Sequence, residues 1–330
     1  MESDLRGLSE LVKTESAFVD RLFSELSKTI VGQRRMVERL LIGLLCRGHI
    51  LLEGVPGLAK TLTVNTLAKV LDLSFSRIQF TPDLLPADVV GTRIFLQASG
   101  QFEVRKGPVF ANIVLADEIN RAPAKVQSAL LESMQEYQVT IGSDTFALPQ
   151  PFFVLATQNP IEQEGTYPLP EAQLDRFMLM VKIDYPSREE EKKILGKVVF
   201  EQPVAVDSVI SISDLERAQH VVSDIYVDEK IKDYAVDVVR ASRLPHSSPD
   251  SPGYCRYLNH GASPRASIAL VQAARANAFI QHRAFVTPED VKSVGPAVLC
   301  HRIALNYEAD AEDIRSDDIV QMIFDYVQIP

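Results

Sequence analysis

The sequence predicts an α/β fold, in which a parallel sheet carries β-hairpin insertions and is followed by a smaller all-helical part. Short apolar stretches at residues 49–53, 111–118 and 151–156 alternate with helix-length segments, the pattern of buried parallel strands joined by helices. Residues 91–107 and 138–148 combine strand alternation with turn residues, as β-hairpins do. Beyond Tyr185-Pro186 the apolar periodicity is helical, so the sheet ends there.

Length, composition and charge restrict the class of protein. A chain of 330 residues has room for two domains and a sizeable core. Its net charge of −10 disfavours nonspecific attraction to nucleic acid or to anionic membranes. No apolar run approaches the ~18–20 residues that span a bilayer, and residues 1–13 are too acidic for a secretory signal. Cys46, Cys255 and Cys300 form no paired motif, so we expect reduced thiols in a cytoplasmic protein without membrane contact.

The first 46 residues are predicted to be mainly helical. Residues 1–29 have the apolar stripe of one or two amphipathic helices, and a core helix runs to about Cys46. Between them lies Ile30-Val31-Gly32-Gln33. Val31 and Gly32 are either part of a simple turn before the core helix or part of a small apolar clamp near an adenine ring. Spacing alone leaves both interpretations open.

A phosphate-binding loop is predicted at Gly54-Val55-Pro56-Gly57-Leu58-Ala59-Lys60-Thr61, followed by Leu62. It stands between an apolar strand and an apolar-periodic helix, the context that such a loop requires. Its glycines let backbone N–H groups turn towards an anion, and the helix N-terminus adds its own N–H groups. Lys60 would neutralise the β- and γ-phosphates, and the Thr61 hydroxyl would bind Mg²⁺. Ala59 stands where glycine is usual, and the alternative interpretation is a strand–helix turn that holds no ligand.

Two adjacent carboxylates, Asp117 and Glu118, follow the apolar strand at residues 111–116. Beside a phosphate loop, Asp117 would hold the metal and Glu118 would orient or deprotonate the attacking water. Taken alone, the pair could equally be two solvated acids at a strand end.

Asn159 follows the strand at residues 151–156, at the edge where parallel sheets bind ligands. It either contacts the γ-phosphate or the water, or it forms a turn before proline. The remaining segments with helical patterns are the short helix from residue 170 and those at 187–200, 213–223, 228–243, 264–281, 287–300 and about 319–327. Ser213 and Glu216 have capping-box spacing, and Thr287-Pro288 has the pattern of an N-cap and N1 proline. Residues 244–263 are rich in Ser, Pro and Gly and are predicted to be a loop.

Together these motifs resemble those of the MoxR family of AAA+ ATPases, over about residues 30–300. The segments that carry the resemblance are Ile30-Val31-Gly32-Gln33, the Gly54–Thr61 loop, Leu115–Ala122, Ala156–Pro160, Leu174-Asp175-Arg176-Phe177 and Gly261–Ala266. The resemblance implies a P-loop NTPase (AAA+) parallel-sheet core with β-hairpin insertions and a helical lid domain. It places an N-terminal helical segment at 1–29, the nucleotide-binding domain at 30–186 and the lid at 187–330. Ala59 is usual in this family.

The resemblance also implies residue roles and partners. Asn159 matches sensor 1, Arg176 matches an arginine finger that acts on a neighbouring subunit, and Arg265 matches sensor 2. Alternatively, Arg176 could be an ordinary cation at a helix end, and Arg265 could pair with a local acid. ATP and Mg²⁺ are the implied substrate and cofactor. The implied assembly is a homo-oligomeric, often hexameric, ring that remodels protein clients, with a von Willebrand factor A domain protein as a separate partner chain.

Three other functions share some of these features. A nucleic-acid motor of the helicase type would grip DNA with the second hairpin, but residues 137–150 contain no Lys or Arg, whereas phosphate contacts need cations. On the first hairpin only Arg93, Arg105 and Lys106 are basic. A magnesium-chelatase-like subunit would share all of these motifs. A nucleotide-gated scaffold without turnover is disfavoured, because every catalytic position is filled.

Overall fold

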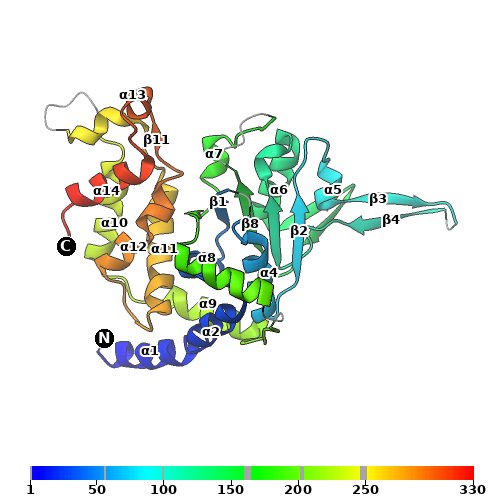
Figure 1. The fold of residues 1–330 in the computed structure, drawn as a ribbon, viewed down its shortest axis with the longest axis horizontal. Coiled ribbons are helices and arrows are strands. Elements are labelled where there is room, and N and C mark those ends of the chain that lie inside the picture. The colour runs from blue at the N-terminus through cyan, green and yellow to red at the C-terminus, as the bar shows by residue number, and fades with distance from the viewer. Residues whose placement is uncertain (1, 56, 99, 160–164, 201–203, 246–250) are drawn as a thin grey trace. The chain divides into compact units, whose positions relative to one another are not determined.

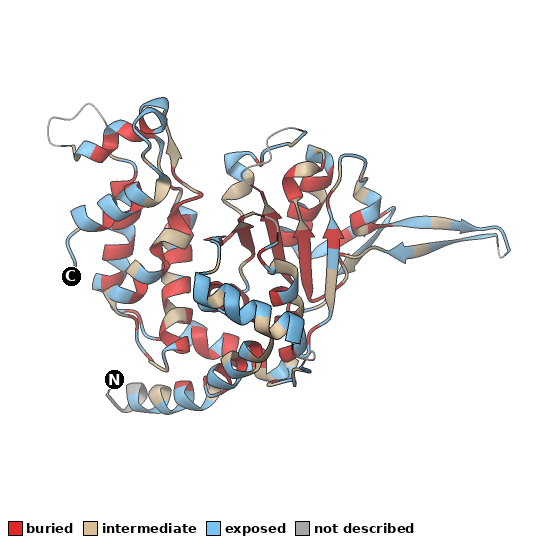
Figure 2. Ribbon diagram, in the orientation of Figure 1, coloured by how far each residue is buried: buried red, intermediate tan, exposed pale blue. Residues whose placement is uncertain are grey.

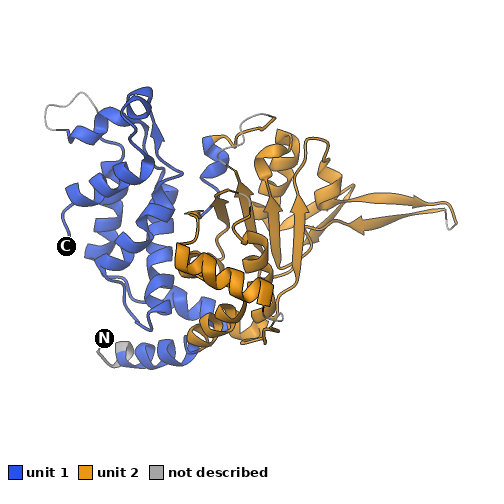
Figure 3. Cartoon of the chain, in the orientation of Figure 1, with its two compact units in different colours: residues 1–17, 171–180, 217–330 blue, residues 18–170, 181–216 orange. Residues whose placement is uncertain are grey.

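The protein is described here by a computed structural model, which covers residues 2–55, 57–98, 100–159, 165–200, 204–245 and 251–330. The chain divides into two compact units (Figure 3). Unit 2 comprises residues 18–170 and 181–216, and unit 1 comprises residues 1–17, 171–180 and 217–330. Among the described residues, no helix combines the length and the apolar character needed to cross a membrane. The domain boundaries expected at residues 29/30 and 186/187 remain predictions.

A five-stranded sheet in the order β2-β5-β8-β1-β9 forms the centre of unit 2 (Figure 1). Its pairs β2–β5, β5–β8 and β8–β1 are parallel. The strands are β1 (Ile50–Glu53), β2 (Phe75–Gln79), β5 (Ile113–Asp117), β8 (Phe153–Gln158) and β9 (Leu179–Lys182). The predicted parallel α/β sheet is therefore confirmed, and its strands β1, β5 and β8 end at one edge.

The central strands of this sheet are buried because helices cover them. Residues 113–116 of β5 and 153–157 of β8 are buried throughout (Figure 2), which explains their uninterrupted apolar sequence. The helices of unit 2 are α2 (Phe18–Thr29), α3 (Arg34–Leu45), α4 (Lys60–Val70), α5 (Pro86–Val90), η1 (Ile119–Arg121), α6 (Ala124–Glu136), α8 (Arg188–Leu195) and the π-helical turn η2 (Gly196–Phe200). Helix α4 packs against β5 and α2, and this fixes the start of α4 beside the sheet edge.

Both predicted hairpins are confirmed. Strands β3 (Gly91–Leu96) and β4 (Gln101–Lys106) pair antiparallel, as do β6 (Gln138–Ile141) and β7 (Asp144–Ala147). Neither hairpin joins the five-stranded sheet. The β3–β4 ladder extends away from the sheet (Figure 1) and leaves most of its side chains exposed. The hairpins are thus insertions in an otherwise alternating α/β unit.

Unit 1 is a helical assembly. Its elements are α1 (Glu2–Glu15), α7 (Glu171–Leu174), α10 (Glu229–Ala241), η3 (Gly253–Tyr257), α11 (Pro264–Ile280), α12 (Pro288–Leu299), α13 (Tyr307–Ala311), α14 (Ser316–Tyr326) and the short strands β10 (Leu258–His260) and β11 (Ala304–Leu305). Helix α12 packs against α11 and α14. Gly295 allows α12 and α14 to approach closely, since a Cβ at this position would overlap the Phe324 ring. Helix α9 (Ile212–Asp224) begins in unit 2 and ends in unit 1.

Two local predictions are wrong. The capping box of α9 is formed by Ser211 and Asp214, not by Ser213 and Glu216, because the helix begins at Ile212. The Asp214 N–H donates to Ser211 Oγ (3.2 Å), and the Ser211 N–H donates to Asp214 Oδ2 (2.9 Å). The segment 244–263, predicted to be a loop, contains η3 and β10, and β10 is paired with β11. That pairing comes from a distant part of the chain, so local composition does not reveal it.

Candidate functional site

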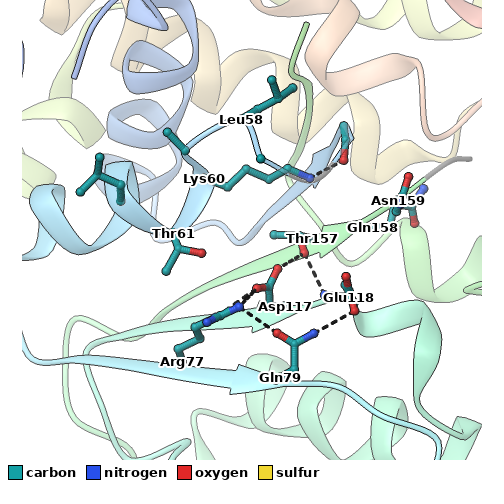
Figure 4. Close-up of a pocket in the computed structure, with 14 residues that line it drawn as sticks. Leu58, Lys60, Thr61, Arg77, Gln79, Asp117, Glu118, Thr157, Gln158 and Asn159 are labelled. Carbon is teal, nitrogen blue, oxygen red and sulfur yellow. Dashed lines mark hydrogen bonds and ion pairs between the residues drawn. The ribbon is translucent and has the colours of Figure 1, made fainter. Parts of the chain in front are cut away.

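A cavity of about 430 Å³ lies at the sheet edge where β1, β5 and β8 end (Figure 4). Its walls come from the loop after β1, from the carboxyl ends of β5 and β8, and from β2. The residues that line it are Gly54, Gly57, Leu58, Ala59, Lys60, Thr61, Leu62, Arg77, Gln79, Asp117, Glu118, Thr157, Gln158 and Asn159. The structure therefore brings most of the predicted phosphate loop, both acids and Asn159 into one space.

The loop after β1 has the backbone shape that an anion cradle requires. Gly57 has φ +88° and Ala59 has φ +55°, both in the left-handed region. Gly54 is confined by packing, because a Cβ there would lie 2.8 Å from the Ile183 carbonyl oxygen. Left-handed turns of this kind, next to a helix N-terminus, let successive N–H groups converge on a phosphate. Among the loop residues, Val55 does not line the cavity, and Pro56 lies outside the described residues.

Lys60 is the first residue of α4 and is half-buried in the cavity. Its Nζ donates to the Gly54 carbonyl oxygen (Figure 4). Burial lowers the pKa of Lys60, whereas the carboxylates of Asp117, Glu118 and Glu53 oppose that shift. A cation that has partly lost its water is well matched to a polyanionic ligand.

Thr157 of β8 connects the two acids. Its hydroxyl donates to Asp117 Oδ1 (2.7 Å) and accepts from the Glu118 backbone N–H (2.8 Å). Glu118 itself has φ +58°, a conformation that non-glycine residues rarely adopt. This strained turn separates the two carboxylates, so that each points to different partners in the cavity.

Arg77 and Gln79 are site residues that the sequence interpretation missed. Arg77 lies opposite Leu115 and Gln79 lies opposite Asp117 in the β2–β5 register. Arg77 donates to Asp117 Oδ2 from its Nε (3.0 Å) and from a terminal nitrogen (2.6 Å). Gln79 accepts from Arg77 (2.9 Å) and donates to Glu118 Oε2 (2.8 Å). Arg77 and Gln79 are two residues apart on a strand, so their side chains point to the same face of the sheet. Their strand also precedes, in the chain, the strand that ends at Asp117. These two facts were the sequence signal for Arg77 and Gln79.

The donor set of the cavity fits a magnesium ion. A carboxylate, Asp117, and a hydroxyl, Thr61, line the same space as the phosphate loop, and Mg²⁺ takes oxygen ligands, commonly one or two carboxylates together with substrate phosphates. Thr157 and Arg77 hold the Asp117 carboxylate in this cavity, as outer partners of metal ligands do.

Val31 and Gly32 are not brought into this cavity. Gly32 has φ +68°, and a Cβ there would collide with the Glu190 carboxylate of α8. Gln33, also left-handed at φ +56°, then leads into α3. The segment is a tight turn in unit 2, and its predicted place at an adenine ring stays a prediction.

Arg176 and Arg265 both belong to unit 1, near Asp175. The Nε of Arg176 is buried and has no hydrogen-bond partner among the described residues. Arg265 stands in the first turn of α11, with 55% of its side chain exposed. One of its terminal nitrogens lies 3.7 Å from Asp175 Oδ2.

Comparison with known proteins agrees with this geometry. The "ATPase family associated with various cellular activities (AAA)" matches residues 49–179, and the "AAA lid domain" family matches residues 255–323. Chaperone MoxR1 of Mycobacterium tuberculosis is 48% identical over 98% of this chain and 85% of its own length. Protein MoxR of Methylorubrum extorquens is 30% identical over 94% of both chains. The crystal structure of a candidate ATPase from Cytophaga hutchinsonii superposes with a TM-score of 0.92, at 49% identity over 99% of both chains.

Proposed function

Because the chain belongs to the MoxR family of AAA+ ATPases, we propose that it hydrolyses ATP in a Mg²⁺-dependent reaction and uses this to remodel or activate a partner protein. The observation that carries the proposal is the single cavity that joins the phosphate loop to Asp117, Glu118 and Asn159. Lys60, Thr61, Asp117, Glu118 and Asn159, to which the proposal gives roles, all line this cavity.

ATP binding depends on the loop and on Lys60. The N–H groups of the loop at residues 54–62 hold the phosphates, and Lys60 exchanges its bond to the Gly54 carbonyl for the β- and γ-phosphates. Thr61 and Asp117 hold Mg²⁺, which supplies positive charge to the phosphate oxygens when it is bound. Arg77 would hold the Asp117 carboxylate in position for this role.

Hydrolysis is an in-line attack of water on the γ-phosphorus. Glu118 orients this water and accepts its proton, and Asn159 hydrogen-bonds to the water or to the γ-phosphate. Gln79 (2.8 Å) and Arg121 (3.2 Å) both donate to Glu118 Oε2 and orient this carboxylate in the cavity. The developing negative charge is stabilised by Lys60 within the subunit and by the two arginines of unit 1.

Arg176 is proposed to act on the site of a neighbouring subunit, and Arg265 to contact the γ-phosphate. A finger supplied in trans requires an oligomer, and a hexameric ring is the proposed form. The proposed client is a protein in a separate chain with a von Willebrand factor A domain, and the proposed location is the cytoplasm.

The test combines two inactive variants. Glu118→Gln should bind ATP and lose turnover, and Arg176→Ala should fold, bind ATP and lose turnover. Mixed together, they should regain part of the ATPase activity, since a site with an intact Glu118 then meets a neighbour with an intact Arg176. Mixtures that stay inactive, while each variant still assembles by size-exclusion chromatography, contradict the role of Arg176 in trans.

Specific ATPase activity across a wide range of protein concentration provides the second measurement. Activity per subunit that rises with concentration supports a site completed between subunits.

No described feature favours the nucleic-acid motor, and the β6–β7 hairpin carries no Lys or Arg. Tight, salt-sensitive DNA binding would revive that alternative.

A further inference from the structure

Asp175 of unit 1 contacts three side chains that lie far from it in the sequence. Arg302 Nε donates to Asp175 Oδ1 (2.8 Å), and the Ser263 hydroxyl donates to Asp175 Oδ2 (2.9 Å). Arg265 lies 3.7 Å from the same Oδ2. All four residues lie within unit 1.

The bond between Asp175 and Arg302 is fixed by burial. The Arg302 side chain is 3% exposed and also donates to the carbonyl oxygens of Phe177 (2.7 Å) and Met178 (3.0 Å). Burial lowers the pKa of Arg302, and the Asp175 carboxylate opposes this shift. If this buried guanidinium moved away from Asp175, a charge would be left unpaired inside the protein, which is energetically costly. Arg302 therefore anchors Asp175 in place.

The contact between Asp175 and Arg265 is of a different kind. Arg265 is 55% exposed, at a distance that gives an ion pair without a close hydrogen bond. It also stands in the first turn of α11, where the helix dipole disfavours a cation and favours an anion. Asp175 supplies that anion, and it accepts a hydrogen bond from Ser263, the N-cap residue of α11. Such a pair is easily exchanged for a stronger anion.

We propose that Asp175 is an internal counter-ion that holds Arg265 in the absence of ATP and competes with the γ-phosphate for it. This inference rests on the proposed role of Arg265. ADP lacks the γ-phosphate, so it leaves the Asp175–Arg265 pair in place, whereas ATP must break it. The pair therefore lowers the affinity for ATP without changing the affinity for ADP.

The prediction is tested by nucleotide binding without hydrolysis. In a Glu118→Gln background, Asp175→Asn should raise the ratio of ATP to ADP affinity by about two- to fivefold, the size of an exposed ion pair. Adding Arg265→Ala should remove the gain. Fluorescent-nucleotide displacement or calorimetry measures both dissociation constants. An unchanged ratio in Asp175→Asn overturns the inference.

Two further variants separate this effect from instability and from failure of the proposed function. Asp290→Asn breaks another buried ion pair of unit 1, to Arg283 (2.6 Å), and should leave the ratio unchanged. Should Asp175→Asn not fold with Arg302 left unpaired, Asp175→Asn/Arg302→Met removes both charges and is measured instead. If Arg265→Ala alone leaves the ratio unchanged, the proposed role of Arg265 fails. If it lowers the ratio while the Asp175 variants do not raise it, only this inference fails.

Discussion

Thr157 and Thr63 offer a matched pair of substitutions in unit 2. Both side chains are buried, with exposed fractions of 1% and 0%. The Thr157 hydroxyl makes two hydrogen bonds, one to the Asp117 carboxylate and one from the Glu118 N–H. The Thr63 hydroxyl has no partner among the described residues. Replacing either by valine keeps the shape and removes only the hydroxyl.

The two valine variants should differ clearly in stability. Thr157→Val loses a bond to a charged group and leaves the Glu118 N–H without its partner, which together cost about 3 kcal/mol. For a unit of this size, that corresponds to a fall in melting temperature of roughly 6–12 °C. Thr63→Val removes an unpaired buried hydroxyl and should be neutral or slightly stabilising. Differential scanning calorimetry measures both.

The same experiment reports on the site. Thr157→Val should also lower kcat, because Asp117 and Glu118 lose the hydroxyl that fixes them, whereas Thr157→Ser keeps the hydroxyl and should keep most activity. Equal melting temperatures for Thr157→Val and Thr63→Val would refute the reasoning. It would mean that the hydroxyl between the two acids contributes nothing that a methyl group does not.

Two further predictions concern packing and pH. Gly295→Ala should destabilise unit 1 by about 1–3 kcal/mol in thermal melts, because the added methyl meets the Phe324 ring, and adding Phe324→Leu should recover part of the loss; no recovery would place the strain elsewhere. Burial lowers the pKa of His49 to about 4, and its Nδ1 accepts from the Val154 N–H, so the neutral ring is the folded form. Since the folded pKa is depressed, this contribution to stability is present above about pH 6.5 and is lost as the pH falls towards 4. Urea midpoints should report about 2 kcal/mol lost from this group between pH 7.5 and pH 5, and His49→Asn should flatten that dependence.

The parts of the fold that depend on local pattern could be predicted from the sequence. Strand β1, the phosphate loop and helix α4 form one continuous segment, in which apolar runs and glycines have local meaning. The hairpins were visible for the same reason. The acids at Asp117 and Glu118 were identified because a strand end in a parallel sheet has a fixed position relative to the loop.

What could not be predicted depends on contacts between distant residues. Arg77 reaches Asp117 across 40 positions, and Arg302 reaches Asp175 across 127. An isolated arginine carries no signal of its partner, and each of these pairs exists only because a strand register or a helix crossing brings the two residues together. The predicted N-cap of α9, Ser213, lies only two residues from the observed N-cap, Ser211. Both are serines, and only the position of the first turn of α9 distinguishes them.

Two charged groups that the proposed reaction uses have a counter-ion within their own unit. Asp117 is held by Arg77 in unit 2, and Arg265 is held by Asp175 in unit 1. The Asp117 carboxylate is only 16% exposed, and its pairing with Arg77 offsets the cost of burying that charge, whereas Arg265 is 55% exposed and its pair with Asp175 contributes about 1 kcal/mol or less. If the proposed roles of Asp117 and Arg265 hold, binding of Mg²⁺ and ATP would exchange these partners and would return only the difference between the old and the new contacts.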